Sequence, residues 1–241
     1  MKALIALTLL VILPLATWAG PAAPVLQPVA LDMSDKAALQ DGANTFVGYC
    51  MGCHGARFQR YQAVADDLGI PYQQMLQTLA PTGASIADHM QTRLQPGDAK
   101  AWFGTEVPDL TLVAQVRGAD WLYAYLLGFH ADPARPWGVN NTVYPNVGMP
   151  NVLESLQGRQ VLDCPAPGLQ PCTRLRVIPG TGSLDAAQFD DKVRNLVAFL
   201  AYSADPIRAR SKQIGLYVLL YLALLIALAY LLKREYWKDV G

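Results

Sequence analysis

Cys50-Met51-Gly52-Cys53-His54 decides how this chain folds, because it has the C-x-x-C-H pattern that attaches c-type haem. The two thiols add to the haem vinyl groups, and the adjacent imidazole supplies one axial ligand to the iron. The chain has 4 Cys and 3 His, and three of these seven residues lie in this box. A zinc site would need a second Cys/His cluster, and a thioredoxin-like pair would need a βαβ context. The sequence shows neither, so we expect one covalent haem c.

The N-terminal end of the chain points to export. Residues 1–19 resemble a secretory signal peptide, with Lys2 before an apolar run and Thr17-Trp18-Ala19 as a cleavage site. A retained N-terminal anchor is the alternative, because only one positive charge precedes the run. Export agrees with the haem motif, since c-type haem is attached on the far side of the bacterial inner membrane.

Near the C-terminus, residues 214–232 form an uncharged apolar run of 19 residues. As a helix this run would extend roughly 28 Å, close to the hydrocarbon thickness of a bilayer. Basic residues flank both of its ends, so the signal peptide rather than charge decides the orientation. We expect a periplasmic haem domain over 20–207, one transmembrane anchor with its basic lead-in over 208–232, and a cytoplasmic tail over 233–241. The protein would then be a single-pass protein of the bacterial inner membrane.

The formal net charge of zero conceals an asymmetry. Residues 20–207 carry 17 acidic and 12 basic side chains, whereas residues 208–241 carry two acidic and six basic ones. A mildly acidic domain would steer toward a basic partner, and an ordinary solvated surface explains the same excess. No basic patch typical of nucleic-acid binding occurs, so nucleic acid is not expected as a partner.

The fold class expected for the domain is mainly α: a c-type cytochrome haem domain with long loops, plus one C-terminal transmembrane helix. Apolar residues at helical spacing predict a helix that delivers the haem box, with Ser34 as its N-cap. A second amphipathic helix is predicted over 185–202, and these two helices should cross near the haem edge. Further expected elements are helices over 73–79, 86–94 and 112–129, and a short strand within 174–182.

A long loop over 131–152 is the candidate source of the second axial ligand. Loops of this length in a domain are usually functional or disordered, and its aromatic residues argue against disorder. Met149 lies near its end, before Pro150, and methionine opposite histidine raises the reduction potential of cytochromes c. The competing ligands are His130, His89, Met75 and Met90.

The helix expected over 112–129 is rich in aromatic residues that would suit a haem wall or an ordinary core. These residues are Trp121, Tyr123, Tyr125 and Phe129. Arg117 precedes them, and a guanidinium pairs well with a carboxylate such as a haem propionate. A surface arginine is the alternative for this residue.

Cys164 and Cys172 are the cysteines that the haem box leaves over. Disulfides persist outside the cytoplasm, so we expect these two residues to form one. Closing such a short loop would stabilise the fold by about 2–3 kcal/mol in the loop-entropy picture.

Taken together, the motifs resemble those of the cytochrome c1 family, the haem c subunit of bacterial cytochrome bc1 complexes. The resemblance covers nearly the whole mature chain, and the order of its pieces is more specific than any one piece. Those pieces are Cys50 to His54, Val107-Pro-Asp-Leu110, Arg117 with Trp121 to Phe129, Tyr144 to Pro150, and Lys233-Arg-Glu-Tyr-Trp237.

The resemblance implies electron transport in a respiratory chain. Cys50 and Cys53 would carry the haem, His54 and Met149 would bind its iron, and Arg117 would meet a propionate. The chain would be the electron-relay subunit of a quinol–cytochrome c reductase, without a catalytic dyad of its own. The implied partners are cytochrome b, the Rieske iron–sulfur protein, a cytochrome c acceptor and membrane lipid, within a dimeric complex.

Two other functions remain open at this point. The first is a stand-alone, membrane-tethered cytochrome that shuttles electrons, although such a protein needs only about half this length. The second is a haem-based sensor, which would require an open sixth position on the iron instead of Met149.

Overall fold

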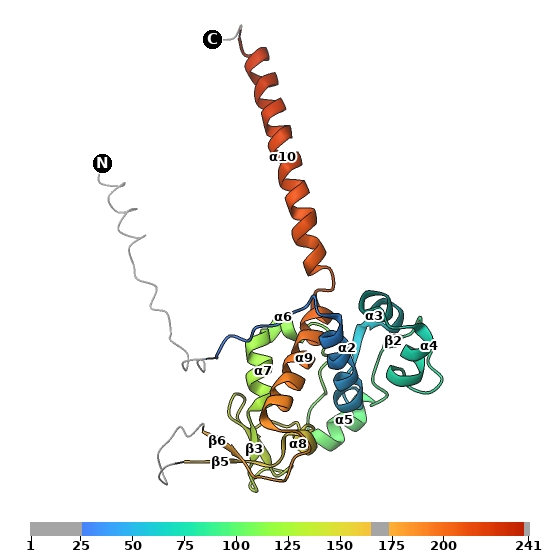
Figure 1. Cartoon of the computed structure of the whole chain (residues 1–241), viewed down its shortest axis with the longest axis vertical. Helices are drawn as coiled ribbons and strands as arrows, with labels where there is room; N and C mark the ends of the chain where they lie inside the picture. The colour runs from blue at the N-terminus through green and yellow to red at the C-terminus, as the bar shows by residue number, and fades with distance from the viewer. Residues whose placement is uncertain (1–25, 165–173, 239–241) are drawn as a thin grey trace, which may run out of the picture.

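Helices α2 (Lys36–Thr45) and α9 (Ala186–Ala204) cross at the centre of the domain, and the other elements are arranged around that crossing (Figure 1). The structure is a computed structural model and describes residues 26–164 and 174–238. The crossing confirms the predicted pairing of the first and last helices of the domain.

The remaining helical segments of the described residues are short, apart from the C-terminal helix. In chain order they are η1 (Phe46–Cys50), α3 (Tyr61–Leu68), α4 (Tyr72–Gln74), η2 (Met75–Leu79), α5 (Pro96–Phe103), α6 (Val113–Arg117), α7 (Ala119–Leu127), α8 (Glu154–Gln157) and α10 (Arg208–Tyr236). The expected class, mainly α with long loops and one transmembrane helix, is confirmed.

Three antiparallel strand pairs complete the described part of the fold. They are β1 (Ala56–Arg60) with β2 (His89–Met90), β3 (Phe129–Ala131) with β4 (Val139–Asn141), and β5 (Gln160–Leu162) with β6 (Leu175–Val177). The pair β3–β4 gives structure to the long loop over 131–152. Strand β6 lies in the segment where a short strand was expected.

Close backbone approach makes the helix crossing possible. Gly42 of α2 faces the backbone of Asn195 in α9, and a Cβ on Gly42 would lie 2.8 Å from Phe199 Cβ. The rings of Phe46 and Phe199 then meet at 5.6 Å, and both are fully buried. Burial of two such rings contributes several kcal/mol, which makes this crossing a main source of stability.

The ends of these two helices follow from local hydrogen bonding. Asp185 begins α9 with a capping box, in which its carboxylate accepts from the Gln188 N–H at 2.8 Å. Asp35, rather than the predicted Ser34, caps α2 by accepting from the N–H groups of Ala37 and Ala38. The prediction was therefore one residue early, because both residue types suit an N-cap.

The helix predicted over 112–129 is wrong as a single element. It is two helices, α6 and α7, separated at Gly118. Gly118 has φ +88°, a conformation that an L side chain rarely adopts. The break turns α7 and its aromatic residues in a new direction.

The helix predicted over 73–79 is confirmed as α4 and η2, whereas the helix predicted over 86–94 is wrong. The carbonyls of Ile86 and Asp88 accept hydrogen bonds from Gln62 and Tyr61, at 2.9 and 3.1 Å. His89 and Met90 then pair with β1. Long-range pairing therefore replaces the local helix that the apolar spacing indicated.

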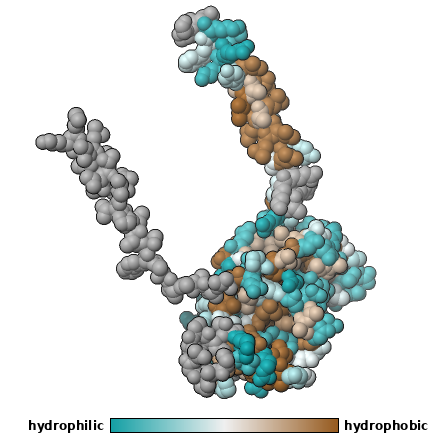
Figure 2. Space-filling model, turned by 60° about the vertical axis from the view of Figure 1, so that its left-hand side comes forward, coloured by the Kyte–Doolittle hydropathy of each residue, from teal (hydrophilic) through white to brown (hydrophobic). Residues whose placement is uncertain are grey.

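Helix α10 extends away from the domain and is apolar along most of its length (Figures 1 and 2). Its segment Ile214–Tyr236 has 23 residues and a mean hydropathy of 2.5, and none of this segment is buried against the rest of the chain. At 1.5 Å per residue, that length of about 35 Å is enough to cross a bilayer. This helix is the transmembrane anchor. The signal peptide predicted over 1–19 lies outside the described residues.

Candidate haem site

A cleft of about 400 Å³ opens on the domain beside the haem box. It collects all five of the residues that the sequence singled out for the cofactor: Cys50, Cys53, His54, Arg117 and Met149. They come from the end of η1, the turn after it, α6 and the loop that follows β4. Apolar side chains supply most of the remaining wall, as is usual for sites that bind a large flat cofactor.

The haem box forms one tight turn. Cys50 ends the π-helical segment η1, and its carbonyl accepts from the N–H groups of Cys53 and His54, at 3.1 and 2.8 Å. Short π-helical segments such as η1 occur often at functional sites. Both thiols are free, and burial raises the pKa of Cys50 to about 12, with a smaller contribution from Cys53. Two free thiols on one turn suit thioether attachment to a single ring.

His54 is fixed in the tautomer that an iron ligand needs. Its Nδ1 lies 2.7 Å from the carbonyl oxygen of Pro108. Because a carbonyl only accepts, Nδ1 carries the proton, and the lone pair of Nε2 is left for a metal. Burial lowers the pKa of His54, with the bond to Pro108 and the charge of Asp109 acting against it. The neutral imidazole is the form that binds iron.

The Val107-Pro-Asp-Leu110 turn is fastened to the haem box by Asp109. Its carboxylate accepts from the N–H of Arg57 at 2.9 Å and from that of Thr111 at 3.0 Å. The Leu110 N–H also donates to the Gly55 carbonyl at 2.7 Å. These bonds hold the Pro108 carbonyl in the position where it accepts the hydrogen bond from His54. The Val107-Pro-Asp-Leu110 turn therefore serves to orient the His54 ring.

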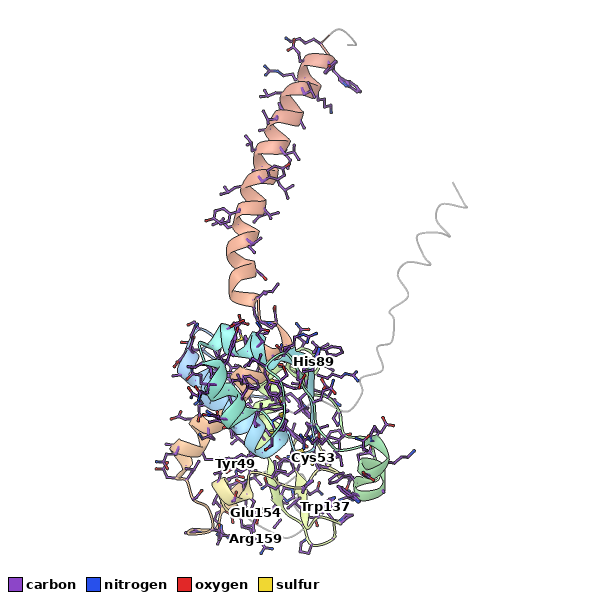
Figure 3. The ribbon with its side chains drawn as sticks, turned by 90° about the vertical axis from the view of Figure 1, so that its right-hand side faces the viewer. Tyr49, Cys53, His89, Trp137, Glu154 and Arg159 are labelled. Carbon is purple, nitrogen blue, oxygen red and sulfur yellow. The ribbon has the colours of Figure 1, made fainter. Side chains whose placement is uncertain are left out.

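Met149 lines the cleft, and its four competitors do not. Met75 and Met90 are buried in the main core, and His130 is buried in β3. His89 lies in a separate hollow beside Arg60 and Arg93, and Figure 3 shows it away from Cys53, nearer to α10. The loop context therefore singled out the one candidate in the cleft, and its bond to iron stays a prediction.

Aromatic side chains build one wall of the cleft. Trp121 stacks on Tyr125, with ring centroids 4.9 Å apart and planes at 9°. Tyr144, from the long loop, meets Trp121 edge-on at 6.3 Å. The wall is thus shared between α7 and the loop, and burial raises the pKa of Tyr125, which keeps its hydroxyl protonated.

Arg117 stands at the edge of this wall. Its guanidinium lies 5.1 Å from the Trp121 ring centroid and 6.0 Å from that of Tyr144. Among the described residues, no carboxylate forms an ion pair with it. A cation held against aromatic rings, without an acidic partner from the described chain, suits a propionate of the cofactor.

Other residues of the cleft escaped the sequence reasoning. Tyr49 precedes the box, Phe103 ends α5, and Leu196 and Leu200 extend from α9. The two leucines lie on the apolar face predicted for that helix, so only their role in the cleft was missed. No sequence pattern marked Phe103 as a cleft residue. Its ring packs against Trp137, with the centroids 5.4 Å apart, and a contact between residues so far apart in the chain cannot be predicted from local spacing. Figure 3 shows Tyr49, Cys53 and Trp137 in the same part of the domain.

The donor set of the cleft fits a haem. It holds two thiols on one turn, an imidazole whose Nδ1 is hydrogen-bonded, a thioether from a different segment, and a guanidinium that forms no ion pair within the described part of the chain. Cys164, one of the two cysteines of the predicted disulfide, does not line the cleft. Cys164 is bonded in a disulfide, but Cys172 lies outside the described residues, so the pairing of the two stays a prediction.

Comparisons with known proteins agree with this geometry. A model of the Cytochrome C1 family matches residues 184–240. The chain is 42% identical over 243 residues to cytochrome c1 of Allochromatium vinosum, with 100% of each chain covered. It is 38% identical over 215 residues to a protein named ammonia monooxygenase gamma subunit from Nitrosomonas europaea, covering 89% of this chain and 88% of the relative. It is 28% identical over 240 residues to cytochrome c1 of Rhodospirillum rubrum, covering 86% and 83%.

Similarity of this extent, together with the apolar anchor helix, is decisive for the family. The chain belongs to the cytochrome c1 family, whose members carry one covalently bound haem c and act as membrane-anchored redox subunits.

Proposed function

We propose that this chain is the electron-transfer subunit of a dimeric cytochrome bc1 complex in a bacterial inner membrane. It takes one electron at a time from the Rieske iron–sulfur protein and passes it to a cytochrome c. The observation that carries the proposal is the cleft, in which His54 and Met149 from different segments meet an aromatic wall. Full-length similarity to a cytochrome c1 supports it.

Each residue of the cleft has one part in this function. The bound haem supplies a one-electron iron couple. Cys50 and Cys53 would hold it by thioether bonds, and His54, whose Nδ1–H donates to the Pro108 carbonyl, would bind its iron through Nε2. Met149 would bind the iron through its sulfur, and methionine together with histidine raises the reduction potential of a haem.

Arg117 and the aromatic wall set the surroundings of the cofactor. The Arg117 guanidinium, which lies against Trp121 and Tyr144, would pair with a haem propionate and neutralise its charge. Apolar side chains exclude water from the cleft, which lowers the local dielectric and favours the less charged, reduced state. The chain thus contributes binding and electrostatics, and quinol oxidation itself belongs to cytochrome b.

The topology follows from the anchor and the leader. Residues 1–19 direct export and are removed, residues 20–207 lie in the periplasm, residues 208–232 cross the membrane, and residues 233–241 end in the cytoplasm. Helix α10 supports this arrangement, because it is long, apolar and unburied in the chain alone. Its exposed side chains meet lipid and cytochrome b.

The relative from Nitrosomonas europaea gives a second candidate function. Its printed name assigns it to an ammonia monooxygenase, and it is 38% identical over most of this chain. This chain could accordingly serve as the redox subunit of a different membrane oxidoreductase. A stand-alone tethered shuttle is the third candidate.

Purification of the tagged chain in mild detergent separates these candidates. We expect the reduced-minus-oxidised spectrum to contain c-type and b-type haem bands together, and the preparation to reduce cytochrome c with quinol. A c-type band alone at full occupancy would favour the tethered shuttle. Co-purification of a monooxygenase without b-type haem would favour the second candidate and contradict the proposal.

A further inference from the structure

Tyr125 and Met149 meet inside the cleft, although they come from α7 and from the loop after β4. The Tyr125 hydroxyl donates a hydrogen bond to Met149 Sδ, with 3.4 Å between oxygen and sulfur. A thioether sulfur is a weak acceptor, and it retains a lone pair for this bond when another binds a metal. The contact places a polar hydrogen on the atom that is proposed as the second axial ligand.

The Tyr125 ring is held from several directions. Trp121 stacks on it at 4.9 Å, and Phe129 meets it edge-on at 5.1 Å and 69°. The Tyr125 backbone carbonyl accepts a hydrogen bond from Asn141 Nδ2 at 2.8 Å. This packing fixes the ring, and with it the direction in which the hydroxyl points.

The loop that carries Met149 is fastened through the same asparagine. Asn141 Oδ1 accepts from the N–H groups of Val143 and Tyr144, at 2.9 and 3.1 Å. Farther along, the Asn146 carbonyl accepts from Arg135 at 3.0 Å. The hydroxyl and the sulfur are therefore both positioned by bonds that do not depend on their own contact.

This contact has a direct chemical consequence for a sulfur that binds iron. A hydrogen bond draws electron density from the sulfur and weakens its donation to the metal. Ferric iron, the harder acid, loses more from this than ferrous iron does. Hydrogen bonding around the ligands is one of the levers by which proteins set haem potentials.

We propose that Tyr125 is a positioning residue whose hydrogen bond to the Met149 sulfur raises the reduction potential of the bound haem c. This inference rests on the proposed function, in which Met149 binds the iron. The Tyr125 hydroxyl would then tune the haem potential, whereas packing against Trp121 and Phe129 needs only the ring.

The test is Tyr125→Phe in the full-length protein, because this substitution removes the hydroxyl and keeps the ring. In a potentiometric titration of the c-type band, we expect the ferrous-to-ferric ratio at a fixed ambient potential to fall roughly three- to fivefold, the worth of one ordinary hydrogen bond. Tyr123→Phe is the matched control. Tyr123 lies on the same helix, and its hydroxyl donates to Asp190, away from the cleft. We expect the potential of this control to stay unchanged.

A double substitution shows whether the effect passes through the sulfur. In a Met149→Leu background, which has no acceptor, Tyr125→Phe should leave the potential unchanged. An equal shift in both backgrounds would overturn the proposal, because the hydroxyl would then act by another route.

The proposed function can fail separately from this inference. The long-wavelength charge-transfer band of methionine-bound ferric haem reports the ligation itself. If the wild type shows this band and Tyr125→Phe leaves the potential unchanged, the role of Tyr125 is wrong. If the wild type lacks the band, the ligation by Met149 is wrong and the inference falls with it.

Discussion

Gly42 of α2 lies directly against the carbonyl group of Asn195 in α9, at the point where the two helices cross. A Cβ on Gly42 would overlap that carbonyl and would approach Phe199 Cβ to 2.8 Å. Gly42→Ala should therefore destabilise the fold by about 1–3 kcal/mol, the usual cost of overpacking, despite the better helix propensity of alanine. Thermal unfolding followed by circular dichroism measures this loss.

Gly48→Ala is the control for that substitution. Gly48 is exposed in η1, and a Cβ there would have no neighbour within 4 Å. The thermal unfolding midpoint of the Gly48→Ala variant should stay within about a degree or two of that of the wild type. Equal midpoints for the Gly42 and Gly48 variants would show that the crossing is less tight than described.

Asp109 is expected to support the haem ligand from a distance. Asp109→Ala leaves the N–H groups of Arg57 and Thr111 without their acceptor, at a cost of about 2 kcal/mol. The Pro108 carbonyl then loses its fixed position against His54, so denaturant should perturb the Soret band at a lower concentration. Asp98→Ala, at an exposed position in α5, should have a much smaller effect. Similar losses in the two variants would contradict this support.

Arg117→Gln should lower the reduction potential, because the variant removes a positive charge that favours the less charged, reduced state. A loss of about tenfold in the ferrous-to-ferric ratio corresponds to ~59 mV for one electron. Arg57→Gln is the control, since Arg57 stacks on the exposed Phe58 outside the cleft. If both substitutions shift the potential equally, Arg117 acts only as a distant charge and not as the partner of a propionate.

The stability of the domain in acid should depend partly on Asp190. Burial raises the pKa of this carboxyl, but hydrogen bonds from Tyr123 and Arg194 outweigh it, and the pKa lies below its ordinary value of 3.8. A depressed pKa in the folded state stabilises the fold above the unfolded value, and this stabilisation is lost as the pH falls through the folded value.

Asp190→Asn should accordingly flatten the fall of the unfolding midpoint below about pH 4. Asp191→Asn, one residue along and without an ion pair among the described residues, should keep the wild-type slope. The same slope in all three proteins would exclude a contribution from the Asp190 network.

Local signals were sufficient for the haem box, the paired helices and the anchor. Cys50 to His54 is a contiguous motif, and the apolar faces of the two helices recur at the helical period. A glycine at position 118 is compatible with a helix break, but the helical spacing of apolar residues continues across it, so the sequence predicted one helix instead of two. At Ile86, Met90 and Leu94, the spacing of four residues imitates a helix, and pairing with β1 overrides it.

The contacts that organise the cleft are long-range, and the sequence does not contain them in readable form. Loop context favoured Met149, yet nothing local indicated that Tyr125 would meet its sulfur. The bond from His54 to Pro108 joins residues 54 positions apart and explains a turn motif that was noticed only by resemblance. The contacts of Arg117 with the rings of Trp121 and Tyr144 likewise depend on how α6, α7 and the loop over 131–152 pack together, which no local pattern indicates.

The most direct test of iron binding by His54 and Met149 is the near-infrared magnetic circular dichroism of the oxidised, full-length protein. This measurement identifies the axial pair of a low-spin ferric haem from its charge-transfer band. We predict histidine–methionine ligation in the wild type, and loss of that signature in Met149→Leu but not in Met90→Leu. A histidine–histidine signature in the wild type, or its histidine–methionine band surviving in Met149→Leu, would contradict the assignment of His54 and Met149 to the iron.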